Sequence, residues 1–295
     1  MCRPLISSFI ALALLSSAYA EAPRMLRLHW EPGKTYKLET VTDTTSRKPG
    51  RDLQSQGMNV TQTTTMTVRK DPGTNDRLVE VKFVSVRGQI SANGQVIGFD
   101  STKPGEANPK LQQAIGRAMG KTFVLVYDDQ ERYRDTRDYG SLAAAPGALT
   151  GLSALADSLN VAKLYRKSLE IGLPPLAVRL GDTWTTDETM TFPQAGETNV
   201  EMNGKFEAVV EREGRKHAKI AFEGKLRSVE RIDKPANLIE IGKGSTIAGH
   251  IFYDLERQTA TFGDYTTNLK MEVMGEELPF EQHITTKMVS IEDSK

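Results

Sequence analysis

The chain has 295 residues, 38 of them basic and 38 acidic, so its formal net charge at neutral pH is zero. Interspersed charge of this kind gives no electrostatic attraction to nucleic acid or to an anionic membrane surface. The single cysteine is Cys2. A chain that loses its N-terminus therefore has no thiol for disulfides, Cys-ligated zinc, iron–sulfur clusters or nucleophilic catalysis.

The first twenty residues have the pattern of a secretory signal peptide. Arg3 is followed by an apolar segment from Leu5 to Leu15 and by the small-residue end Ala18-Tyr19-Ala20. We expect cleavage after Ala20 and export to the periplasm or the exterior. No later segment has the roughly 20 consecutive apolar residues that span a bilayer, so no transmembrane anchor is expected.

A first β-rich half is predicted over residues 21–138. Met66 and Val68 precede the turn residues 71–73, and Val79 and Val81 follow them with period-two spacing, which predicts an antiparallel hairpin. The half also contains one predicted helix over 108–120, which begins at the N-cap pair Asn108-Pro109 and has an apolar face. A strand is expected over "KTFVLVYDD".

A helical apolar insert is predicted over residues 139–175. Its first part, from Ser141 to Leu159, has Asp157 as its one charged residue, and Pro146 and Pro174 bound the helical spacing. We interpret the insert as helices buried between the two β-rich halves, with a mobile apolar lid as the alternative.

The second β-rich half is predicted over residues 176–295. Apolar and polar residues alternate from Val200 to Val210 and again from Ala218 to Leu226, on either side of a turn at 213–215. Alternation with period two indicates a hairpin that is covered on one face.

A short motif occurs in both halves. Gly33-Lys34-Thr35-Tyr36 is echoed by Gly181-Asp182-Thr183-Trp184, and the segment ending at Asp100 resembles the one ending at Asp254. We expect each glycine to make a turn and each aromatic residue to anchor a strand in the core. The predicted fold class is α+β, mostly antiparallel β, with two duplicated curved-sheet halves separated by short helices. The alternative is chance reuse of glycine-threonine-aromatic strings.

Candidate chemistry is sparse. Histidines 29, 217, 250 and 283 lack metal-binding spacing, so no metal, cofactor or catalytic residue is predicted. The acidic cluster 128–138 could bind calcium, but its arginines favour ion pairing around a hairpin. "GKGST", from Gly242 to Thr246, has part of a phosphate-loop pattern, and we interpret it as a turn.

The two glycine-threonine-aromatic motifs, the paired hairpins and the export signal together resemble an uncharacterised family of exported bacterial proteins, a domain of unknown function. That resemblance implies bacterial export and carries no established activity or site residues. A looser similarity of architecture links the chain to periplasmic lipid-carrier proteins, in which a curved antiparallel sheet wraps helices around an apolar cavity.

The leading functional hypothesis is a noncatalytic exported protein that binds a hydrophobic ligand or lipid in an apolar cleft. The candidate lining residues are Leu149, Leu152, Leu155, Phe206, Phe222 and Met271. The first alternative is an envelope structural or protein-interaction module, motivated by the Thr-rich segment "TQTTTMTV" as an exposed strand edge. The second is a hydrolase with a shifted carboxylate near His250 or His283.

Overall fold

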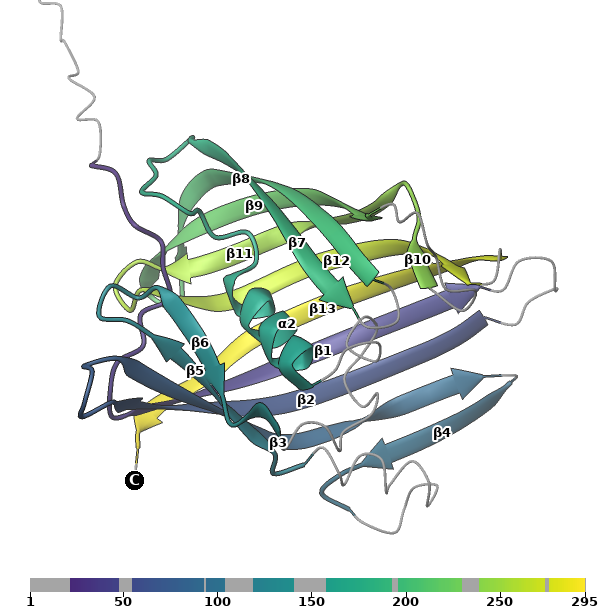
Figure 1. Cartoon of the computed structure of the whole chain (residues 1–295), viewed down its shortest axis with the longest axis horizontal. Helices are drawn as coiled ribbons and strands as arrows, with labels where there is room; N and C mark the ends of the chain where they lie inside the picture. Colours follow the sequence, from purple (N-terminus) through teal and green to yellow (C-terminus); the bar gives the residue numbers. More distant parts are fainter. Residues whose placement is uncertain are drawn as a thin grey trace, which may run out of the picture.

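The computed structural model describes residues 22–47, 55–92, 94–103, 119–140, 158–192, 196–229, 239–273 and 276–294. The expected signal peptide lies outside these ranges, as do residues 108–118 of the first expected helix. The described residues form one large antiparallel sheet and one α-helix, so the mostly antiparallel β prediction is confirmed (Figure 1).

The sheet consists of two meanders. The first contains β1 (Lys34–Arg47), β2 (Ser55–Lys70), β3 (Arg77–Ala92), β5 (Thr122–Tyr127) and β6 (Tyr133–Arg137). The second contains β7 (Thr183–Phe192), β8 (Gly196–Arg212), β9 (Arg215–Ser228), β11 (Ser245–Asp254), β12 (Thr259–Val273) and β13 (Glu276–Asp293). Two short strands complete the sheet: β4 (Gln95–Asp100) pairs with β3, and β10 (Ile239–Ile241) pairs with β12.

The first and last strands join the two meanders. β1 pairs with β13 in antiparallel register from Lys34↔Asp293 to Ser46↔Phe280, giving the strand order β6-β5-β3-β2-β1-β13-β12-β11-β9-β8-β7. The expectation that helices divide two sheets is therefore wrong. Alternation along a strand shows which face is buried, but it does not show which distant strand lies alongside.

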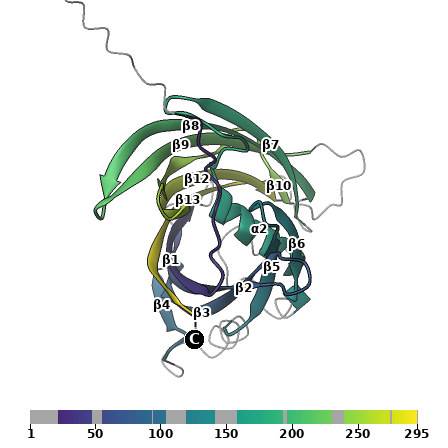
Figure 2. The ribbon, with the colours of Figure 1, turned by 90° about the vertical axis from the view of Figure 1, so that its left-hand side faces the viewer.

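The sheet is open and strongly curved, and the helix α2 (Ser158–Glu170) lies inside its concave face (Figure 2). Ala162, Tyr165 and Leu169 of α2 pack against the first meander. The helix is followed by Gly172 in the left-handed conformation (φ +71°) and by Pro174. This glycine and proline are typical of a helix end, and the predicted boundary at Pro174 is confirmed.

Both predicted hairpins form. β2 and β3 pair across the turn at 71–76, and β8 and β9 pair across the turn at Glu213-Gly214. Both turn residues of the second hairpin have positive φ, 50° for Glu213 and 73° for Gly214, which matches the twist of the flanking strands.

The repeated glycines have equivalent local geometry. Gly33 (φ +84°) donates its N–H to Val68 O at 2.9 Å, and Gly181 (φ +92°) donates to Phe206 O at 2.8 Å. Each glycine therefore makes the turn that enters a first strand, as the motif predicts.

The aromatic residues of the two motifs differ in burial. Tyr36 is buried in the core, whereas Trp184 on the edge strand β7 is only partly buried, with its ring against Gly204. The expectation that both aromatic residues anchor a strand in the core is therefore wrong for Trp184. An edge strand has a neighbour on one side only, so its large side chains are covered less completely.

The N-terminal segment 22–30 crosses one end of the curved sheet (Figure 2). Arg24 pairs with Val178, and His29 N–H donates to Gln258 O at 2.7 Å. Trp30 at the end of the segment is buried against Tyr36, with ring centroids 5.2 Å apart in an edge-to-face arrangement. The segment thus closes this end of the concave face.

Candidate ligand-binding cavity

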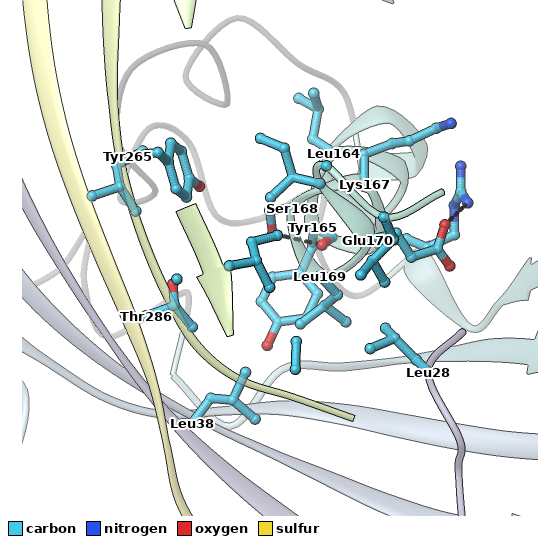
Figure 3. Close-up of a pocket in the computed structure, with 18 of the residues that line it drawn as sticks. Leu28, Leu38, Leu164, Tyr165, Lys167, Ser168, Leu169, Glu170, Tyr265 and Thr286 are labelled. Carbon is cyan, nitrogen blue, oxygen red and sulfur yellow. Dashed lines mark hydrogen bonds and ion pairs between the residues drawn. The ribbon is translucent and has the colours of Figure 1, made fainter. Parts of the chain in front are cut away.

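A cavity of about 650 Å³ lies between α2 and the concave face of the sheet (Figure 3). The inner side chains of the central strands face one side of α2 across the cavity. Leu38, Tyr265 and Thr286 lie on the sheet side, and Leu164 and Leu169 lie on the helix side. The N-terminal segment contributes Leu26, Leu28 and Trp30 at one end.

The wall of the cavity is largely apolar. Its apolar members come from both meanders, from the N-terminal segment and from α2. They include Leu26, Leu28, Leu38, Met66, Leu164, Leu169, Val200, Met202, Leu226, Ile247, Ile251, Ile284 and Met288. A wall of this composition favours burial of hydrocarbon.

The middle of the sheet side is polar but uncharged. We call this part the polar floor, and it comprises Thr40, Thr42, Gln62, Thr267, Gln282 and Thr286. Register explains the grouping, because Gln62 pairs with Thr40 and Thr40 pairs with Thr286, which places the three side chains in one row across β2, β1 and β13. Gln282 pairs with Thr267 four residues further along β13.

Hydrogen bonds tie part of the polar floor together. The hydroxyls of Thr40 and Thr286 are 3.2 Å apart, and Gln282 Nε2 donates to Thr44 Oγ1 at 3.1 Å. Within the described part of the chain, the side chains of Thr42 and Thr267 have no hydrogen-bond partner although both residues are buried. Their hydroxyls are therefore available to a molecule in the cavity.

Two tyrosines of the cavity are held in the neutral form. Burial raises the pKa of Tyr165 to about 12, against the opposing effect of its 2.7 Å hydrogen bond with Thr64. Burial also raises the pKa of Tyr265. Both phenols are hydrogen-bonding groups without charge at physiological pH.

Charged side chains lie near the end of α2. Arg166 Nη1 is 2.6 Å from Glu170 Oε2 and its guanidinium stacks on the ring of Tyr133, while Tyr127 donates to Glu170 Oε1 at 3.2 Å. Burial raises the pKa of the Glu170 carboxyl, and the neighbouring Arg166 and the Tyr127 hydrogen bond oppose that shift. Lys167 forms an ion pair with Glu188 of β7, which connects the helix to the edge of the sheet.

A second polar network fixes the N-terminal segment. Glu131, in the turn between β5 and β6, has a positive φ of 63°. Its carboxylate is 2.7 Å from His29 Nδ1 and 3.2 Å from Arg77 Nη2, and it accepts the Trp30 N–H at 3.2 Å. The unusual backbone at Glu131 is therefore held by contacts that position the segment, and each oxygen of the carboxylate has a partner.

The sequence-predicted lining residues are distributed differently. Leu149, Leu152 and Leu155 lie outside the described residues. Phe206 and Phe222 are buried in the hydrophobic cluster of the second meander, and Met271 packs against that cluster. None of these three is among the described residues that line the cavity.

The other candidate residues have structural partners. Asp128 is buried and accepts hydrogen bonds from the Gln130 and Arg132 amides at 2.9 Å, and Arg132 Nε lies 2.8 Å from it. Arg134 Nε lies 3.6 Å from Asp128 and Arg137 Nε lies 3.8 Å from Asp135, so ion pairing around the β5–β6 hairpin is confirmed. Residues 242–244 form the turn before β11, as expected. Among the described residues, no group of three or more potential metal ligands converges.

Sequence reasoning missed the polar floor. In β1 the buried positions alternate from Tyr36 and Leu38 to Thr42 and Thr44, while Lys37 and Asp43 are exposed. Extending the parity of Tyr36 and Leu38 along the strand would have identified the threonines as inward-facing. The alternation was present in the sequence, but threonine is not counted among the apolar residues that indicate a buried face.

Comparisons with known proteins give no family. No family model matches the chain, and no curated protein matches it. Solved structures that align over most of its length include DynF from the dynemicin biosynthesis pathway of Micromonospora chersina, with 7% identity, coverage of 97% of this chain and 92% of that one, and a TM-score of 0.21. An outer membrane channel from Pseudomonas putida F1 aligns with 8% identity, coverage of 90% and 99%, and a TM-score of 0.24.

Similarity at these TM-scores carries no argument about fold or function. The resemblance to an uncharacterised exported family and the architectural similarity to periplasmic lipid carriers therefore stay predictions. In the described part of the chain, no helix combines the length and hydropathy needed to cross a bilayer.

Proposed function

We propose that this protein binds a hydrophobic small molecule or lipid in the cavity between α2 and the concave face of the sheet. The observation that carries the proposal is the cavity itself. Its volume of about 650 Å³ falls within the range of about 300–1,000 Å³ typical of ligand sites. Its largely apolar wall and the hydrogen-bonding groups of its polar floor are both features of such sites.

Export belongs to the same proposal. Residues 1–20 have the signal-peptide pattern, and cleavage after Ala20 would deliver the binding protein to the periplasm or the exterior. A noncatalytic carrier or sensor of apolar molecules suits that location, because hydrocarbon needs a protein to cross an aqueous compartment.

We further propose that the two meanders arose by duplication. Gly33 and Gly181 have the same turn geometry and hydrogen-bond type before β1 and β7. The turns after β5 and β11 are also alike, because Asp128 and Asp254 are both buried and both accept amide hydrogen bonds within the turn. On this correspondence the counterpart of Asp254 is Asp128, not Asp100 as the sequence comparison suggested.

The alternative functions have less support. The segment "TQTTTMTV" that motivated an interaction module belongs to β2, which is paired on both sides by β1 and β3. A hydrolase would need a shifted carboxylate beside His250 or His283. His283 is exposed and lies 2.9 Å from Asp264, and His250 lies 3.5 Å from the exposed Glu207. Neither histidine is among the described residues that line the cavity.

The proposal is tested by native mass spectrometry on protein purified from its own compartment, followed by organic extraction. A stoichiometric apolar molecule is expected. A protein that carries no extractable molecule and does not bind the neutral apolar dye N-phenyl-1-naphthylamine would contradict the proposal.

A cavity-filling substitution gives the sharpest variant. Gly263 lines the cavity on β12, and a Cβ atom there would have no neighbour within 4 Å. Gly263→Phe should fill the space and weaken dye binding at least about tenfold, because the ligand loses the volume that buries it. Fluorescence titration checks this.

The matched control is Gly98→Phe. Gly98 is an exposed glycine within β4 that does not line the cavity, and a Cβ atom there would meet only Gly88 O, at 4.0 Å. Unchanged binding in this variant is expected. Equal binding by both variants would mean that the dye occupies another site.

A further inference from the structure

Most of the charged groups that line the cavity are paired with a group of opposite charge. Arg166 is paired with Glu170, and Lys167 is paired with Glu188. Of the other two cations of the described lining, Arg132 pairs with Asp128 at 2.8 Å, whereas Arg27 donates to a neutral acceptor, Gln130 O, at 3.3 Å in an exposed contact. Three of the four described cations of the lining are therefore held by carboxylates, and the contact of the fourth, Arg27, is exposed.

The groups on the polar floor are uncharged. The row of Gln62, Thr40 and Thr286 crosses the central strands, and Gln282 and Thr267 lie further along β13 and β12. Hydroxyls and amides can each donate to or accept from a neutral polar group. They cannot neutralise a carboxylate or a phosphate, whose burial without a cation costs far more than the burial of a hydroxyl or ester.

We infer that the ligand class of this cavity is an uncharged lipid or apolar molecule that carries a hydroxyl, ester or amide group, with that group on the polar floor and its hydrocarbon against the apolar wall. This inference rests on the proposed function and narrows it. Free fatty acids and phospholipids are disfavoured because each brings an anion to a site in which three of the four described cations are already held by carboxylates.

The test compares two molecules with the same acyl chain. Monooleoylglycerol is neutral and oleate is anionic at alkaline pH, so the comparison isolates the head group. Each displaces N-phenyl-1-naphthylamine from the full chain, at concentrations below those at which either aggregates. Monooleoylglycerol should bind at least about tenfold more tightly than oleate.

A first variant tests the role of ion pairing. Glu188→Gln removes the partner of Lys167, and both side chains are partly exposed, so folding should be retained. Oleate affinity should rise several-fold relative to monooleoylglycerol affinity in this variant. An unchanged oleate affinity would contradict the argument that paired cations exclude anions.

A second variant tests the polar floor. Thr286→Val should weaken the binding of monooleoylglycerol about tenfold, because a polar group of the ligand loses its hydroxyl partner. Binding of the dye, which does not depend on that hydroxyl, should persist. Thr285→Val is the control. Thr285 is the neighbour of Thr286 within β13, so its side chain is on the opposite face of the strand, and it does not line the cavity.

The outcomes separate the two proposals. If oleate binds as tightly as monooleoylglycerol, the inference about the head group is wrong and the proposed function stands. If neither lipid displaces the dye and the dye itself does not bind, the proposed function fails and the inference fails with it.

Discussion

Asp254 illustrates how a single buried carboxylate organises a turn. Its Oδ1 accepts the amide N–H groups of Glu256 and Arg257 at 3.0 Å, and its Oδ2 is 2.7 Å from Arg215 Nε. Burial opposes ionisation, but the amide hydrogen bonds and the Arg215 contact outweigh it and lower the pKa of Asp254. The charged form is therefore the one that stabilises the fold.

We expect Asp254→Ala to lower the free energy of unfolding at neutral pH by about 3–5 kcal/mol, because it leaves Arg215 and two amides without their acceptor. A carboxylate with a lowered folded-state pKa stabilises the protein above its unfolded pKa and loses that effect as pH falls through the folded pKa. The difference in the free energy of unfolding between the variant and the wild type should therefore shrink below about pH 4. Urea unfolding across pH checks both statements.

The control at the residue scale is Asp264→Ala. Asp264 has a carboxylate that is partly exposed on the neighbouring strand β12, where it lies 2.9 Å from the exposed His283. Its loss should cost at most about 1 kcal/mol. Equal effects of the two substitutions would show that the Asp254 network contributes little.

At the scale of elements, the end of α2 is fixed by its contact with the second meander. Gly172 combines a positive φ of 71° with close packing, since a methyl group there would lie 2.7 Å from Cδ1 of Phe222. The sequence-predicted residue Phe222 thus acts on the cavity indirectly, by supporting the helix that forms one side of it. Glycine is required here for both conformation and space.

Gly172→Ala should cost about 1–2 kcal/mol from the left-handed backbone and about 1–3 kcal/mol more from displacement of Phe222. Gly214→Ala supplies the control, because Gly214 has a similar φ of 73° but nothing within 4 Å of its Cβ position. The difference between the two variants in urea unfolding measures the packing contribution. Equal losses of stability in the two variants would mean that the helix end and Phe222 move apart without an energetic penalty.

At the scale of the whole molecule, the β1–β13 pairing makes one sheet from two meanders. Each meander has its own hydrophobic cluster, but Leu173 and Ala260 pack against both. The cavity draws its lining from both meanders, so a change in their relation would alter the site itself. We therefore expect the described sheet to unfold as one cooperative unit.

The two tryptophans of the chain report on this expectation, since Trp30 packs in the first cluster and Trp184 lies beside the second. Variants that retain only one of them, Trp184→Phe and Trp30→Phe, allow each meander to be followed by fluorescence. Each variant's fluorescence transition should coincide with its own circular dichroism transition in urea. A fluorescence midpoint that departs from the circular dichroism midpoint would show that one meander unfolds separately.

The sequence alone determined the local elements. Period-two alternation predicted the β2–β3 and β8–β9 hairpins, and the glycine motifs predicted the turns at Gly33 and Gly181. Pro174 predicted where the helical region ends, because proline cannot continue a helix. These features depend on backbone preferences and on the burial of one face, which neighbouring residues encode.

Tertiary structure decided the site. The pairing of β1 with β13, the place of α2 inside the concave face and the row of Gln62, Thr40 and Thr286 all arise from contacts between distant segments. Phe206 and Phe222 have the pattern of buried residues, but burial does not distinguish a packed core from a cavity wall. That distinction depends on how closely two surfaces approach, and only the packing of the helix against the sheet sets that distance.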